Sequence, residues 1–66
     1  MDITLNGESR TFPAALSIAD LVAQLELTGK RIAVEVNGDI VPRGQHASTV
    51  LQGGESVEIV VAVGGG

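Results

Sequence analysis

The chain has 66 residues, enough for one small domain and too few for two, because separate hydrophobic cores need on the order of 50 residues each. Its hydrophobic fraction of 44%, against 18% charged residues, is typical of a globular chain rather than a disordered one. So short a chain has a thin core and little room for an enclosed active site. We therefore expect no catalytic activity of its own.

The charge balance is acidic, with eight acidic and four basic residues and a net charge of −4. One aromatic residue, Phe12, and the absence of a basic cluster disfavour nucleic acid as a partner. An acidic surface instead suits a docking partner with a basic face. The absence of cysteine excludes disulfides and cysteine-based metal sites and points to the cytoplasm. Neither a signal peptide nor a run of about 20 apolar residues is visible, so we expect no export and no membrane insertion.

The N-terminal quarter has the pattern of a β-hairpin. Residues 2–6 alternate between apolar and polar side chains, which predicts a half-buried strand. Asn6-Gly7 favours a two-residue turn, so residues 8–12 are expected to return as an antiparallel strand that ends at Pro13.

A single helix is expected after this hairpin. Ser17 is suited to be its N-cap, with Asp20 as the capping-box partner, and Gly29 is a plausible terminator. An apolar stripe follows at positions i, i+3, i+4 and i+7: Ile18, Leu21, Val22 and Leu25.

The second half reads as strands. Residues 32–36 alternate, and Asn37-Gly38 is a second hairpin signal that leads to a short edge strand at Ile40-Val41, cut off by Pro42. Residues 43–49 are polar and loop-like, with room for one helical turn. A brief strand is expected at 49–51, and the β-branched run 57–63 predicts a buried central strand.

This order of elements predicts an α+β fold of the ubiquitin-like β-grasp type. We expect a mixed sheet of four to five strands with one main helix packed on one face, and with the first and last strands parallel. Residues 1–63 form the domain, and residues 64–66 are expected to be a flexible glycine tail.

The tail Gly64-Gly65-Gly66 carries the functional signal, because nothing about stability favours glycine at this place. Without a Cβ atom, three glycines can pass through a narrow channel over about 10 Å and present a terminal carboxylate to a partner's active site. Since the chain has no cysteine, any sulfur it carries would be a thiocarboxylate at Gly66. The alternative interpretation is a frayed terminus or a cloning remnant.

A docking face is then needed, and the last strand offers one. If alternate residues from Val57 to Val61 point to the helix, then Glu58, Val60 and Ala62 share the other face of the sheet. Two of these three are apolar where polar side chains are expected, and Ala33 extends the patch. The alternative is that a bulge or loop covers these small side chains.

Two further polar residues receive simpler interpretations. His46 is the sole histidine and lies in a polar loop, so we expect it to be solvated rather than to bind a metal. Arg43 either contacts an acidic group of a partner or solubilises the edge of the sheet, and we favour the second.

Two segments resemble the ThiS family, the ubiquitin-like sulfur carriers of thiamine thiazole biosynthesis. They are Val-Asn-Gly-Asp-Ile-Val-Pro-Arg at 36–43 and Val-Glu-Ile-Val-Val-Ala-Val-Gly-Gly-Gly at 57–66. The resemblance implies that the Gly66 carboxylate is adenylated by an E1-like, ATP-dependent partner (ThiF), with Gly64 and Gly65 as the threading segment. Sulfur from a cysteine desulfurase then displaces AMP, and the thiocarboxylate docks on thiazole synthase (ThiG) and gives its sulfur to the forming ring. The chain itself would bind no cofactor, since ATP is used by the partner.

One departure from the family pattern and two alternatives stay open. Gly54-Glu55 stands where Gly-Asp is expected, which concerns the turn rather than the chemistry. The small subunit of molybdopterin synthase shares the fold and tail, although the short chain and the segment 40–43 favour ThiS. A non-covalent β-grasp interaction module is the third possibility, and it would tolerate the loss of Gly65 and Gly66.

Overall fold

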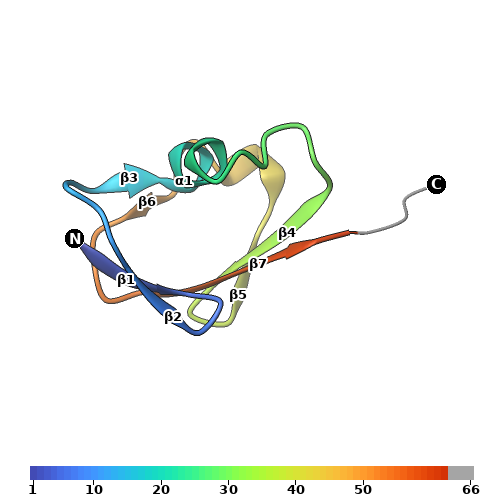
Figure 1. The fold of residues 1–66 in the computed structure, drawn as a ribbon. Helices are drawn as coiled ribbons and strands as arrows, with labels where there is room; N and C mark the ends of the chain where they lie inside the picture. Colours follow the sequence, from blue (N-terminus) through green and yellow to red (C-terminus); the bar gives the residue numbers. More distant parts are fainter. Residues whose placement is uncertain (63–66) are drawn as a thin grey trace.

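The computed structural model describes residues 1–62, which form one α-helix, one 3-10 helix and seven strands (Figure 1). In chain order they are β1 (Asp2–Leu5), β2 (Glu8–Thr11), β3 (Leu16–Ser17), α1 (Ile18–Gln24), β4 (Ile32–Val36), β5 (Asp39–Val41), η1 (Arg43–Gln45), β6 (Val50–Leu51) and β7 (Ser56–Val61). The predicted domain boundary at residue 63 and the predicted tail 64–66 lie outside the described residues.

Five strands form a mixed sheet in the order β2-β1-β7-β4-β5. β1 and β7 run parallel, with Thr4 beside Ser56, while the other neighbours are antiparallel. Helix α1 lies over one face of this sheet (Figure 1). The predicted β-grasp fold and the central position of the last strand are therefore confirmed. The sequence did not predict β3, which pairs with β6 in a separate two-stranded sheet.

Both Asn-Gly pairs form the predicted hairpin turns. Asn6 and Asn37 have φ angles of 50° and 51°, and the glycines that follow them have 82° and 87°. These left-handed values suit the two-residue turns that match the twist of antiparallel strands. The asparagine side chains also hold the neighbouring strand: Asn6 Oδ1 accepts a hydrogen bond from the Ile59 N–H at 2.8 Å, and Asn37 Oδ1 from the Ser56 N–H at 2.9 Å. Each turn is thereby fastened to β7.

Helix α1 begins as predicted. The Ser17 Oγ accepts a hydrogen bond from the Asp20 N–H at 3.0 Å, and the Asp20 carboxylate accepts one from the Ser17 N–H at 3.3 Å. These two bonds complete the capping box. The apolar stripe also faces the core, with its first three residues buried and Leu25 partly buried.

The end of the helix differs from the prediction that Gly29 terminates it. The helix ends at Gln24, and Glu26 adopts the left-handed conformation with a φ angle of 58°. The Leu27 N–H bonds to the Val22 carbonyl and the Glu26 N–H to the Ala23 carbonyl, each at 3.0 Å. This is a Schellman motif with glutamate where glycine is usual. Leu27, the residue after Glu26, is partly buried and packs against the core, which is the hydrophobic contact that often accompanies this motif.

The core lies between α1 and the covered face of the sheet. Its buried hydrophobic residues are Ile3, Leu5, Phe12, Leu16, Ile18, Leu21, Val22, Val34, Leu51, Val57 and Ile59. β7 was predicted to be a buried strand, but only the face toward the helix is buried, and Val61 at its end is 38% exposed. Within residues 1–62, no helix is long and apolar enough to cross a membrane.

Candidate functional site

The candidate site is the outer face of the five-stranded sheet, which is the face opposite α1. Along β7, Val57 and Ile59 are buried toward the helix, and Glu58 and Val60, which alternate with them, are exposed. Ala62, which follows the strand, is exposed as well. The structure thus places all three predicted docking residues at exposed positions, while their docking role stays a prediction.

Cross-strand register extends the outer face over β4 and β5. Ala33 lies opposite Val60, and Glu35 lies opposite Glu58 on one side and Ile40 on the other. Opposite residues in a sheet share a face, so these side chains belong to the outer face with Val60. Ala33 was predicted to extend the patch, and the register confirms that it lies there.

Two large apolar side chains of the outer face are exposed to solvent. Ile40 is 75% exposed and Val60 is 61% exposed. Ile40 was not predicted as part of the site. The signal for it was the Asn37-Gly38 turn: a two-residue loop pairs Val36 with Asp39, so Ile40 must share a face with Glu35.

A shallow depression of about 340 Å³ lies where the chain leaves the sheet. It is lined by Arg31, Ile32, Ala33, Arg43, Val60 and Ala62. The Ala62 N–H donates to the Arg31 carbonyl at 2.9 Å, which extends the pairing of β7 with the segment before β4. The last described residue is therefore fixed beside a largely apolar surface that two arginine residues help to line.

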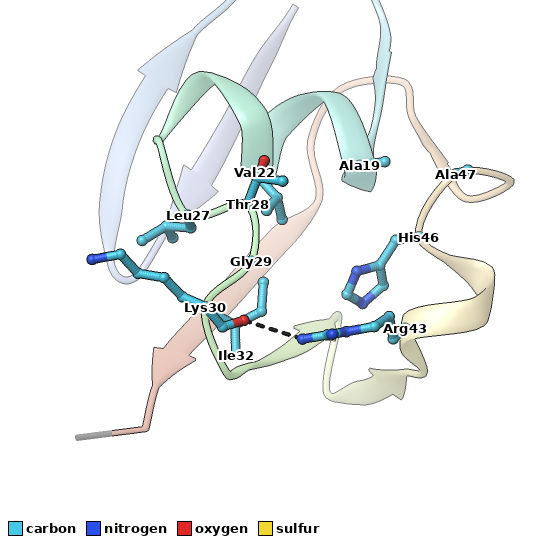
Figure 2. A pocket seen from close by; sticks show the side chains of 10 residues that line it. All are labelled: Ala19, Val22, Leu27, Thr28, Gly29, Lys30, Ile32, Arg43, His46 and Ala47. Atoms are coloured by element: carbon cyan, nitrogen blue, oxygen red, sulfur yellow. Dashed lines mark hydrogen bonds between the residues drawn. The ribbon is translucent and has the colours of Figure 1, made fainter. Parts of the chain in front are cut away.

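Arg43 also joins two loops. Its Nη2 donates a hydrogen bond to the Lys30 carbonyl at 3.1 Å (Figure 2). This contact was not foreseen, because residues 30 and 43 are brought together only by the β4-β5 hairpin. A guanidinium has five N–H groups, so the side chain keeps donors for an acidic group of a partner.

A second cavity of about 300 Å³ lies beside α1, and His46 lines it (Figure 2). The prediction that His46 is solvated is wrong, since only 9% of the residue is exposed. The 3-10 turn η1 directs the chain inward after Pro42, and the His46 carbonyl accepts a hydrogen bond from the Ala19 N–H at 3.0 Å. Its Nε2 lies 3.0 Å from the Val41 carbonyl, which can only accept, so Nε2 carries the proton. His46 therefore joins the loop to the edge strand.

Glu55 closes the turn that precedes β7. Its carboxylate accepts hydrogen bonds from the N–H groups of Gln52 at 2.9 Å and Gly53 at 2.8 Å. Partial burial of this carboxylate raises its pKa, but these backbone hydrogen bonds and that of its own N–H outweigh the burial, and the pKa of Glu55 is lowered. The glutamate that departs from the expected Gly-Asp thus stabilises the turn itself.

Among the described residues, no group of three or more His, Cys, Asp or Glu side chains is placed so that it could hold a metal ion. The predicted sulfur-carrying residue Gly66 and the predicted threading residues Gly64 and Gly65 lie outside the described residues. The described part of the candidate site is thus the surface beside the root of the tail.

Comparison with known proteins gives consistent matches. A family model described as the ThiS family matches residues 3–66. The protein named sulfur carrier protein ThiS from Escherichia coli is 29% identical over 66 residues, which cover all of both chains. The crystal structure of the thiamine biosynthesis protein (ThiS) from Geobacter metallireducens matches with a TM-score of 0.85 and 29% identity over all of both chains.

A longer relative also matches. Thiazole synthase from Paramagnetospirillum magneticum is 36% identical over 66 residues. These residues are the whole of the present chain but only 20% of that relative. The chain therefore spans one fifth of the length of this thiazole synthase.

Proposed function

The chain belongs to the ThiS family, and from this premise we propose that it is a sulfur carrier of thiamine biosynthesis whose Gly66 carboxylate carries the sulfur. The observation that carries the proposal is the family match over residues 3–66, which includes the three terminal glycines. The proposal requires Gly66 to be the C-terminal residue of the active protein, because only a free carboxylate can be adenylated.

The proposed chemistry is performed by partner enzymes. A Gly66 carboxylate oxygen attacks the α-phosphorus of ATP, pyrophosphate leaves, and an acyl adenylate forms. A sulfide-level nucleophile, supplied by a cysteine desulfurase together with a thiol reductant, attacks the acyl carbon, and AMP leaves. The product is the thiocarboxylate. The chain is in this scheme a co-substrate rather than an enzyme, and it binds no ATP itself.

Three partners follow from this proposal: an E1-like adenylyltransferase (ThiF), the cysteine desulfurase, and thiazole synthase (ThiG) as the sulfur acceptor. The choice of acceptor is supported by the relative named thiazole synthase, one fifth of which matches the whole chain. A thiazole acceptor favours ThiS over the molybdopterin synthase subunit. The expected compartment is the cytoplasm.

Docking of the folded domain has to support the threading of the tail. Fixing three glycines costs roughly 1 to 2 kcal/mol each in backbone entropy. Val60 at 61% exposure and the neighbouring Ala62 provide apolar area that a partner can cover. We assign the docking role to the outer face, with Glu58, Val60 and Ala62 at its centre.

ATP–pyrophosphate exchange with the adenylyltransferase tests the proposal. Deletion of Gly66 withdraws the carboxylate by about 3.5 Å, and an alanine appended after Gly66 places a methyl group in a channel shaped for glycine. Misplacement by about 1 Å can cost 100-fold, so both variants are expected to exchange at least about 100-fold more slowly than the parent. Both should bind the adenylyltransferase within a few-fold of the parent, because the docking face is unchanged. Exchange at the parental rate by either variant would contradict the assignment of the reaction to Gly66, whereas a parent that binds without any exchange would favour the non-covalent module.

A further inference from the structure

Two carboxylates face each other on the outer face. Glu35 of β4 and Glu58 of β7 are direct cross-strand partners. Like charges directly opposite each other destabilise a sheet. The pair is therefore a local conflict in the free protein, at a place where a neutral or basic residue would serve stability better.

Among residues 1–62, no basic residue is a register partner of either carboxylate. The register neighbour of Glu35 on the other side is Ile40. Beyond Glu58, the β1-β7 pairing ends at Leu5 beside Val57, and the Asn6 side chain continues the contact through hydrogen bonds to Ile59. The row across the outer face is thus an exposed apolar side chain, two carboxylates and an amide.

The opposite charge lies at the other end of this face, around the depression beside Ala62. Arg31 and Arg43 line this depression, and Arg43 also borders the cavity beside α1, so it lies at the margin of the face. Ala62 lies four residues beyond Glu58, which corresponds to about 13 Å along an extended strand. Between the acidic and the basic end lie Ala33 and Val60, which are opposite each other. The outer face is therefore polarised along β7, basic at the root of the tail and acidic at the far end.

We propose that this polarity fixes the direction in which the activating partner docks. The partner that binds this face is the adenylyltransferase. Its docking surface has an apolar centre, with an acidic side chain near the channel for the tail and a basic side chain opposite Glu35 and Glu58. The inference rests on the proposed function for the identity of this partner. Docking in the reversed direction would bring like charges together and point the tail away from the channel. Binding in the correct direction relieves the repulsion between the two carboxylates.

The proposal predicts opposite effects on stability and binding. Glu35→Gln and Glu58→Gln each raise the midpoint of thermal unfolding, because the repulsion is removed, and each weakens binding to the adenylyltransferase about 3-fold to 10-fold. Glu58→Lys weakens binding further, because it places like charges in the interface. A residue with a purely structural role would change stability and binding in the same direction.

Glu8→Gln is the matched control. It removes the same charge, and its cross-strand partner is the core residue Leu5, so Glu8 is not on the outer face. We expect it to leave binding within 2-fold of the parent. Arg31→Gln probes the basic end and should weaken binding about 3-fold or more.

Calorimetric titration of the adenylyltransferase without ATP or a sulfur donor measures the affinities, and sedimentation of the free protein checks for dimers. The inference is supported if both Glu→Gln variants unfold at higher temperature and bind more weakly while Glu8→Gln binds like the parent. It is overturned if either variant binds like the parent, if Glu8→Gln weakens binding equally, or if the outer face pairs two copies of the chain. A parent that binds but is never adenylated would instead overturn the proposed function and leave the docking inference standing.

Discussion

At the scale of single residues, Glu26 adopts a backbone conformation that is unfavourable for any residue with a Cβ atom. Its φ angle of 58° lies in the left-handed region, where the Cβ atom crowds the backbone. Glu26→Gly removes that crowding while keeping the Schellman hydrogen bonds. We expect it to raise the free energy of unfolding by about 0.5 to 1 kcal/mol, measured by urea denaturation.

Gly29→Ala is the control for this prediction. Gly29 has a φ angle of 84° and open space around its Cβ position, so alanine adds backbone strain and no clash. It should lower the free energy of unfolding by roughly 1 kcal/mol. A loss of stability in Glu26→Gly would mean that the glutamate side chain contributes more than its conformation costs.

Glu55 makes the stability of the protein depend on pH. Its pKa is lowered in the folded state, so the folded protein holds the proton less tightly than the unfolded chain does. The stabilisation is complete above the ordinary glutamate pKa of roughly 4.3 and is lost as the pH falls through the lowered value. Glu55→Gln should therefore be less stable than the parent at pH 7, with a difference that shrinks in acid. Unfolding midpoints between pH 7 and pH 3 measure this difference, and a gap that widens in acid would contradict the assignment.

At the scale of elements, β7 contributes one face to the core and the other to the proposed docking surface. Val60→Lys should leave the fold intact, because Val60 is 61% exposed, and it should weaken binding to the adenylyltransferase by at least about 10-fold. Circular dichroism checks the fold, and calorimetric titration measures the affinity.

Val50→Lys is the matched control for Val60→Lys. Val50 is 50% exposed but lies on β6 in the small sheet, away from the outer face. It should bind the adenylyltransferase like the parent. Equal loss of affinity in the two variants would show that added positive charge, and not the outer face, causes the effect.

Local chemistry explains which elements could be predicted from the sequence. The two Asn-Gly turns and the Ser17 capping box depend on neighbouring residues, and the structure contains all three. The end of the helix depends on tertiary burial of Leu27, which overrides the preference of Gly29 for that position. β3 and β6 have two residues each and are strands because they pair with each other. Two residues are too few to show the alternation that predicts a strand, so the sequence did not indicate β3.

At the scale of the whole molecule, long-range contacts decide what the sequence left open in the candidate site. His46 is buried because η1 carries it against Val41, and Arg43 reaches Lys30 across 13 positions in the chain. Neither contact follows from local pattern. The residues of the outer face could be predicted from strand alternation. Burial of Val57 and Ile59 leaves the alternate residues of β7 on this face, and the hairpin turn fixes which residues of β4 and β5 share a face.

The central claim is that sulfur is carried as a thiocarboxylate at Gly66. Mass alone is an ambiguous readout, because exchange of oxygen for sulfur and oxidation of the Met1 thioether both add about 16 Da. A thiol-specific alkylating reagent separates them. The chain contains no cysteine, so a thiocarboxylate is the one group on it expected to react as a thiol does.

The decisive measurement is therefore intact mass after alkylation, following incubation with the adenylyltransferase, ATP and a sulfur source. We predict that the parent gains one alkyl group, that fragmentation places it on Gly66, and that neither omission of ATP nor deletion of Gly66 leaves any labelled protein. A parent that stays unlabelled while the enzymes convert a known carrier would contradict the claim, and so would a Gly66-deleted variant labelled at the parental rate.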